Sequence, residues 1–211
     1  MSRMFPRLLL VAALALAVIP EAQATSIAPI TQDQMTDAAT YIVRGKVVDV
    51  WTEVDERGML WTRAGVEVSH TFKGPDSPDY LVVDSMGGTM GERRMVVPSA
   101  ARYSEGEHVV LFLTEIDFGR KLTTVGMFLG KFDIRRAPGE TRQHVMRWQT
   151  DAPDYDGQFL PHPPAERREY LDDLVVQIEQ RLATGWDGQL IPGMNAEELR
   201  AVNTPDRRRA Q

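Results

Sequence analysis

The sequence predicts a mostly β protein whose core is an antiparallel barrel or sandwich of five to six short strands. A short helix precedes this core and an amphipathic helix follows it. Segments rich in Val, Ile, Tyr, Phe and Trp follow one another at hairpin spacing, separated by Gly, Pro, Asp or Ser. No helical period of apolar residues intervenes from Tyr41 to Thr150, which favours antiparallel strands over an α/β fold.

The N-terminal residues 1–24 have the three parts of a secretory signal peptide. Arg3 and Arg7 precede an apolar run that is shorter than the ~20 residues of a bilayer span, and Ala24 ends a small-x-small cleavage site. We expect cleavage after Ala24 and a product in the periplasm or outside the cell that does not span the membrane. A retained N-terminal anchor is the alternative.

The composition of the 211-residue chain limits its chemistry. Its net charge is −6, which argues against nucleic acid or anionic lipid as a partner. The chain has no cysteine, and this excludes disulfides, thiol catalysis and thiolate metal sites. One core is feasible at this length, so we expect one domain with appendages.

The first predicted elements are a helix and a long strand. Thr31 begins a capping box, which predicts a short helix that reaches about Thr40. The strand 41–54 follows, and its apolar phase slips by one residue after Val47, close to Gly45. Such a slip predicts a β-bulge or a sharp bend in this strand.

Five further strands are predicted, each bounded by turn residues. They cover residues 59–74, 79–86, 107–115, 122–136 and 143–150. The strand 107–115 is the most apolar, so we expect it at the centre of the sheet. The strand 122–136 is interrupted by Gly126 and Gly130.

The composition changes after Thr150, and this sets the domain boundaries. We assign residues 25–150 to the β domain, 151–164 to a proline-rich linker, 165–185 to the amphipathic helix with its cap, and 186–211 to a tail. One face of the helix is apolar and is expected to pack on the β domain; it consists of Leu171, Leu174, Val175, Ile178 and Leu182. The tail contains a further short helical segment at 194–202.

Ser85 lies in the segment DSMGG, which has the look of the nucleophile elbow of a serine hydrolase. An elbow needs Gly-x-Ser-x-Gly on a strand that turns straight into a helix, with a His and an acid elsewhere. Val83 stands in place of the first Gly, and no helical period follows. We therefore interpret Ser85 as a strand-end residue. A serine hydrolase that uses Ser85 is the alternative.

The glycines that follow, Gly87, Gly88 and Gly91, admit two interpretations. Their N–H groups would suit a phosphate, but a phosphate loop needs Gly-Lys-Ser/Thr at the start of a helix, and Glu92 would repel the anion. A wide hairpin or loop with positive φ angles explains the glycines better.

No metal site and no cofactor are predicted. The four histidines are scattered, and His70 lies on the apolar face of its strand, which favours a buried or interfacial side chain over a ligand. Asp154 and Asp156 match only part of a calcium loop, so a solvated acidic turn is the preferred interpretation. A calcium-steadied structural domain of the cell envelope is a further alternative.

Two tryptophans, Trp51 and Trp61, flank the turn of the first predicted hairpin. They are candidates for stacking on a ligand or partner. The preferred interpretation is that they close the end of the barrel, because tryptophan is on average largely buried.

Several short sequence segments of the chain are similar to those of a group of exported bacterial β-proteins. They are VRGKV in the first strand, VEV and KG in the second, the GG…G loop, and GE.VVLFL further on. Over roughly residues 35–135 the chain resembles this group, which in turn is similar to the OB-fold barrels of tissue inhibitors of metalloproteinases and netrin-like modules. The resemblance implies a five-stranded OB-like barrel in which Gly45 permits the first strand to coil. The animal inhibitors chelate zinc through an N-terminal Cys, and this chain has none.

The expected function is that of an exported, non-catalytic binding module whose partner is another exported protein. A secreted protease, bound or inhibited, is one candidate partner by analogy of fold. The expected contact surface is a barrel-end loop, either residues 52–60 or residues 86–93.

Overall fold

The computed structural model describes residues 30–117, 119–147, 169–191 and 194–204. The predicted signal peptide, the linker 151–164 with Asp154 and Asp156, and the last seven residues of the tail lie outside the described residues.

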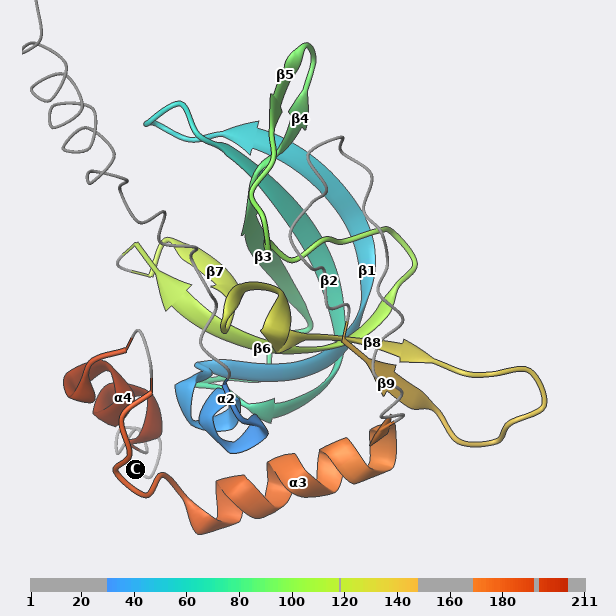
Figure 1. The fold of residues 1–211 in the computed structure, drawn as a ribbon, viewed down its shortest axis with the longest axis vertical. Helices are drawn as coiled ribbons and strands as arrows, with labels where there is room; N and C mark the ends of the chain where they lie inside the picture. The colour runs from blue at the N-terminus through green and yellow to red at the C-terminus, as the bar shows by residue number, and fades with distance from the viewer. Residues whose placement is uncertain (1–29, 118, 148–168, 192–193, 205–211) are drawn as a thin grey trace, which may run out of the picture.

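The protein is mostly β, as predicted, and its main sheet is antiparallel (Figure 1). This sheet consists of β1 (Tyr41–Val54), β2 (Leu60–Lys73), β3 (Tyr80–Met86), β6 (His108–Ile116), β7 (Lys121–Thr124), β8 (Lys131–Arg135), β9 (His144–Met146) and β10 (Glu169–Tyr170). Its order is β10-β9-β8-β6-β1-β2-β3, and β7 pairs with β6 outside this path. A separate hairpin is formed by β4 (Gly88–Met90) and β5 (Arg93–Met95). In the described part of the chain no ladder joins β3 to β7, so a closed barrel is not shown.

The long β1–β2 pair contains the irregularity that the sequence predicts. The register of the two strands shifts between Arg44 and Gly45 and again between Val47 and Asp49, so the bulge is confirmed. A Cβ atom on Gly45 would lie 2.4 Å from the backbone oxygen of Glu67. Only glycine therefore allows β1 to approach β2 this closely.

The predicted strand 122–136 is wrong as a single strand. It is divided into β7 and β8 by a short 3₁₀ helix, η1 (Met127–Gly130). The division lies where the glycines predicted an interruption: Gly126 has a φ of 62°, and a Cβ on Gly130 would lie 2.7 Å from the Phe112 oxygen. The chain thus leaves β6 after Thr124 and pairs with it again further along.

The central strand β6 contributes to two apolar clusters, because alternate residues point to opposite faces of the sheet. Val110 and Phe112 belong to what we call the helix-side core, beneath the helices. The other face forms the inner core, whose buried residues are Val43, Val47, Ala64, Val66, Val83, Ala101, Tyr103, Val109, Leu111 and Leu113. A strand that is buried on both faces reads as an unbroken apolar run, which is why it was predicted as central.

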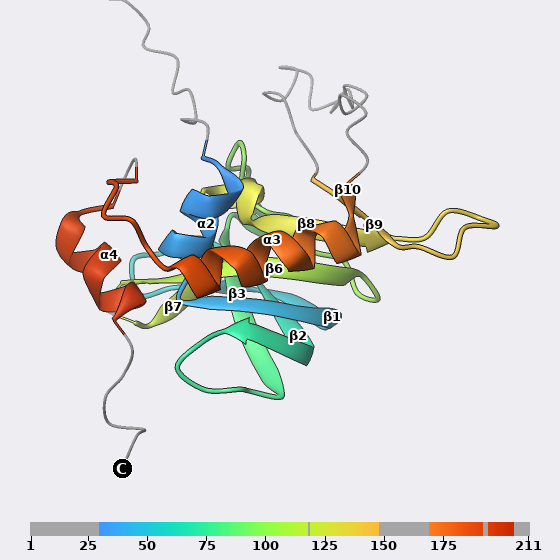
Figure 2. The ribbon, with the colours of Figure 1, turned by 90° about the horizontal axis from the view of Figure 1, so that it is seen from below.

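Three helices cover the helix-side core: α2 (Gln32–Ala38), α3 (Leu171–Thr184) and α4 (Ala196–Asn203). They lie together at the end of the molecule opposite the β4–β5 hairpin, and Figure 2 shows α3 running along this side of the sheet. The predicted capping box is present, since Thr31 accepts from the Gln34 amide and Gln34 accepts from the Thr31 amide. Leu171, Leu174 and Ile178 are buried, which confirms the apolar face predicted for α3.

The start of α3 and the position of His70 differ from the prediction. The helix begins at Leu171 and not at Ala165, because Glu169 and Tyr170 pair with β9 as the short strand β10. His70 is exposed on the surface, where its ring contacts Phe72 with 4.4 Å between centroids. Alternation along β2 was misleading here, since only the first half of that strand has a buried face.

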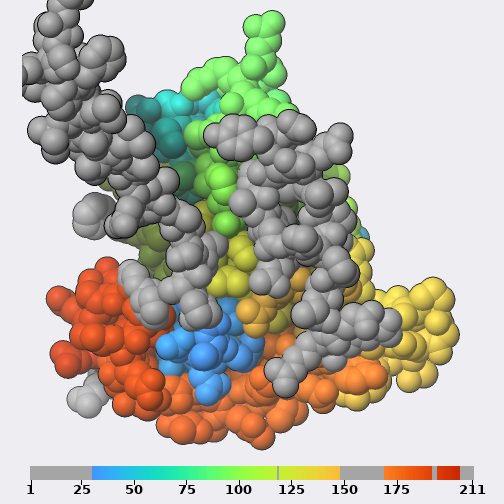
Figure 3. Space-filling model, in the orientation of Figure 1, coloured from blue at the N-terminus to red at the C-terminus, as the bar shows by residue number. Residues whose placement is uncertain are grey.

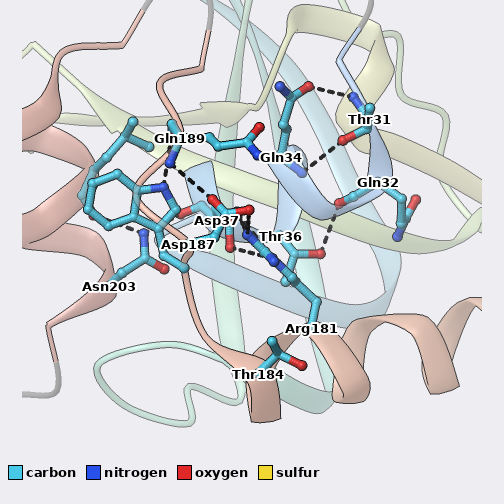
Figure 4. A network of polar contacts seen from close by, with 12 residues as sticks. Thr31, Gln32, Gln34, Thr36, Asp37, Arg181, Thr184, Asp187, Gln189 and Asn203 are labelled. Carbon is cyan, nitrogen blue, oxygen red and sulfur yellow. Dashed lines mark hydrogen bonds and ion pairs between the residues drawn. The ribbon is translucent and has the colours of Figure 1, made fainter.

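Polar contacts join α2 to α3 (Figure 4), and Lys73 joins the helices to the sheet. Arg181 of α3 donates Nε to Oδ1 of Asp37 at 3.0 Å and Nη2 to Oδ2 at 2.6 Å. Lys73, at the end of β2, donates to the backbone oxygens of Thr36 at 2.8 Å and Asp37 at 3.2 Å, and to Oδ1 of Asn203 at 3.1 Å. One strand end and three helices therefore meet at Asp37.

Within the described ranges, no helix combines the length and the apolar character needed to cross a membrane.

The buried Asp37–Arg181 pair yields a stability prediction. Asp37→Asn removes the closest counter-ion of Arg181, whose side chain is 11% exposed, and leaves it with the more distant Asp187 at 3.4 Å. We expect a loss of about 3–5 kcal/mol in the free energy of unfolding, measured by urea denaturation. The matched control is Asp172→Asn, because the Asp172 side chain is 70% exposed in its ion pair with Arg142; its expected loss is below about 1 kcal/mol. Equal losses in the two variants contradict this account.

Lys73 yields a prediction about pH. Burial lowers the pKa of Lys73 from 10.5 to about 8. The negative charge of Asp37 acts in the other direction and raises this pKa, but by less. Between these two values the unfolded chain binds more protons than the folded one, so this group makes folding more favourable as the pH rises. From about pH 7 to about pH 9.5, the wild type should gain about 2 kcal/mol in unfolding free energy relative to Lys73→Met. A difference between the two proteins that does not change with pH contradicts the assignment.

Candidate functional site

Two loops predicted as contact surfaces lie against each other at one end of the molecule. The Gly87 amide donates to the Leu60 oxygen at 2.8 Å, and Thr62 Oγ1 donates to the Gly87 oxygen at 2.9 Å. Arg93 Nη2 donates to the Gly58 oxygen at 2.9 Å. We call this region, residues 52–61 and 86–96, the hairpin end. Its β4–β5 hairpin projects from the body of the protein (Figure 3, green).

Asp55 organises the β1–β2 turn. Its Oδ1 accepts from the amides of Arg57 and Met59, each at 2.9 Å, and its Oδ2 accepts from Trp61 Nε1 at 2.9 Å. These bonds, led by the one from Met59, hold the pKa of Asp55 below its usual value. Lys121 Nζ approaches the same carboxylate at 3.7 Å, which ties the turn to the start of β7.

The two tryptophans have different surroundings. Trp61 is only 7% exposed, and Lys121 Nζ lies 4.7 Å from the centre of its ring. Trp51 is partly exposed, and its Nε1 donates to Glu53 Oε1 at 2.7 Å. Trp61 thus packs into the end of the sheet, whereas Trp51 keeps part of its surface at the outside of the β1–β2 hairpin.

A row of charged side chains, Glu53, Arg63 and Asp84, crosses β1, β2 and β3 beside Trp51. Arg63 lies 2.8 Å from Glu53 Oε2 and 3.1 Å from Asp84 Oδ1. Burial raises the pKa of Asp84, although the Leu122 amide and Arg63 favour its ionised form. These contacts join β1, β2 and β3 and also reach β7, so this row is structural.

The glycines form the hairpin expected from the sequence. Gly91 has a φ of 60° in the two-residue turn between β4 and β5, while Gly87 and Gly88 have φ angles of 102° and 143°. A Cβ on Gly88 would lie 2.7 Å from Thr62 Oγ1. The chain continues from Gly91 into a strand, so these glycines do not open a helix as a phosphate loop does.

Ser85 is the penultimate residue of β3 and is 6% exposed. Its hydroxyl donates to the Ala101 oxygen at 2.6 Å, which anchors the connection between β5 and β6 over the inner core. A nucleophile instead directs its proton to a base and its oxygen to a substrate. The geometry of Ser85 is that of a structural tether.

Three exposed methionines are the surface residues that the sequence analysis missed. Met59 is 37% exposed, Met86 39% and Met90 42%. Each is adjacent in sequence to a glycine with positive φ, namely Gly58, Gly87 or Gly91. A methionine beside a turn glycine is a sequence pattern that could have predicted their exposure, because turn residues lie at the surface.

A second polar group is buried at the edge of the inner core. Lys131 Nζ lies 2.6 Å from Asp133 Oδ1 and 3.0 Å from Glu107 Oε2, beside the ring of Tyr103. Burial raises the pKa of the Tyr103 phenol. No group of three or more His, Asp or Glu side chains in the described ranges is placed to hold a metal ion.

No family model matches this chain, and no curated protein matches it in sequence.

Gly88 yields a test of how the hairpin end is built. Gly88→Ala places a side chain at a φ of 143° and within 2.8 Å of Thr52 Cγ2, so we expect a loss of about 2–4 kcal/mol in the free energy of unfolding. Gly91→Ala is the matched control, because its Cβ would meet nothing within 4 Å; its expected loss is about 1 kcal/mol. Thermal and urea unfolding measure both. If Gly88→Ala is no more harmful than Gly91→Ala, the β4–β5 hairpin does not pack on Thr52 and Thr62.

Proposed function

We propose that this protein is an exported, non-catalytic binding module that contacts another exported protein through its hairpin end. The observation that carries the proposal is the convergence of two hydrogen-bonded hairpins that expose methionine side chains at one end of the sheet. Loops held on a scaffold in this way are the usual place for binding residues. The signal-like N-terminus supports a location in the periplasm or outside the cell.

We also propose that the main sheet curls into an OB-like barrel. In the order β3-β2-β1-β6-β7, the two outer strands are β3 and β7. Asp84 Oδ2 on β3 accepts a hydrogen bond from the Leu122 amide on β7 at 3.2 Å, so the two edges approach each other. A curled antiparallel sheet whose first and last strands meet has the layout of a small barrel. The hairpin end then corresponds to one rim of this barrel.

The chemistry of the hairpin end suits a protein partner. Met59, Met86 and Met90 offer apolar surface with three rotatable bonds each, which adapts to an irregular partner surface. Arg93 and Arg94 on β5 are exposed beside them and supply donors for a polar rim. A net charge of −6 disfavours nucleic acid as the partner.

A secreted protease is the first partner class to test, by analogy with the tissue inhibitors of metalloproteinases. This support comes from resemblance of fold, so it concerns the class of partner and not a mechanism. Zinc chelation by an N-terminal cysteine is not part of the proposal, because the chain has no cysteine.

A capture experiment tests the proposal. The chain from Thr25 is immobilised and exposed to periplasmic and secreted proteins, and the bound proteins are identified by mass spectrometry. Met90→Glu should weaken capture of a stoichiometric partner by more than about tenfold, as expected for a residue at the centre of an interface. The control is Val176→Glu, which changes a residue of similar exposure on α3, 48% against 42%.

Two results contradict the proposal. One is a blank, in which the unmodified chain captures no stoichiometric protein. The other is capture that Val176→Glu abolishes and Met90→Glu leaves intact, since the contact surface then lies on the helices. Equal melting temperatures of the two variants ensure that a loss of capture reflects binding and not unfolding.

A further inference from the structure

The exposed methionines are concentrated at the hairpin end. Four methionines in the described residues are exposed by 37% or more, and three of them are Met59, Met86 and Met90. The fourth, Met127, is 38% exposed and lies in η1, away from these two hairpins in the sequence. Met35, by contrast, is 0% exposed in the helix-side core.

Hydrogen bonds link the backbone segments that carry the three methionines. Met90 pairs with Arg93 across the β4–β5 hairpin, and Arg93 donates to the oxygen of Gly58, the residue before Met59. Gly87, the residue after Met86, donates to the oxygen of Leu60, the residue after Met59. Met59 and Met86 are thus each adjacent to a residue whose backbone joins the hairpins, and Met90 lies opposite Arg93 in the β4–β5 ladder.

We infer that the hairpin end is a site of reversible oxidation, in which a peroxide converts these methionines to sulfoxides and thereby releases the partner. The inference rests on the proposed function. In the chemical step a lone pair of the thioether sulfur attacks one peroxide oxygen, the O–O bond breaks and an S–O bond forms. The sulfur is oxidised by two electrons and keeps the attacked oxygen. The other peroxide oxygen leaves as water after proton transfer. The reaction needs only the thioether and the peroxide.

The consequence for binding follows from polarity. A sulfoxide oxygen is a strong hydrogen-bond acceptor, and an interface that buries it without a donor must remove its water. At a surface of three such residues we expect a loss of affinity of about tenfold or more. The fold should persist, because these side chains are exposed and the buried Met35 is shielded.

The first measurement maps the modification. The folded chain is treated with graded hydrogen peroxide, digested, and each methionine-containing peptide is scored by mass spectrometry for the addition of one oxygen. Met59, Met86 and Met90 should be oxidised together with Met127, at doses that leave Met35 intact. Resistance of the three at a dose that oxidises Met127 overturns the inference.

The second measurement links the modification to binding, in a Met127→Leu background so that this exposed thioether is removed. Peroxide treatment should lower capture of the partner from the exported-protein fraction by about tenfold or more, and methionine sulfoxide reductase should restore it. A Met59→Leu, Met86→Leu, Met90→Leu variant, compared with itself before and after peroxide, should show no such loss.

Full oxidation at the three positions with unchanged capture overturns the inference, and so does a loss that the reductase does not reverse. If the untreated chain captures nothing, the proposed function fails and the release of a partner fails with it. The order of oxidation among the methionines is still decided by the first measurement, so the two failures are distinguishable.

Discussion

The close approach of β1 to β2 at Gly45 is the constraint on which the rest of the sheet depends. A Cβ atom there would lie 2.4 Å from the Glu67 oxygen, and the register shifts at this point and again after Val47. β1 can therefore pair with β6 over its first half, where Ile42 enters the helix-side core. Beyond the bulge it pairs with β2 alone and carries the β1–β2 turn out to the hairpin end.

The two ends of the molecule use different chemistry. At the helix end, the buried Asp37 carboxylate pairs with Arg181 of α3. The Asp37 backbone oxygen accepts from Lys73 at the end of β2 and from Asn203 of α4. Removing Asp37 is costly, because the buried Arg181 then loses its closest counter-ion. At the hairpin end Asp55 shapes the turn, and the surface combines exposed methionines with exposed charged residues such as Arg93 and Arg94.

Features that depend on neighbours in the sequence were predictable. The capping box at Thr31, the bounds of β1 and the bulge after Val47 follow from spacing within a few residues. Features that depend on distant residues were not. The division at Gly130 is set by the Phe112 oxygen of another strand, and the late start of α3 is set by pairing of Tyr170 with β9. For the candidate site, the two loops were predicted and the methionines beside their turn glycines could have been, but the contact between the loops requires the fold.

Hydrogen–deuterium exchange on the complex with the captured protein tests the central claim most directly, because it reports which backbone segments a partner covers. The account predicts slower exchange on binding at residues 52–61 and 86–96, with unchanged exchange along α3. Protection of α3 or α4 with unchanged exchange in both hairpins would contradict it, since the partner would then sit on the helix end.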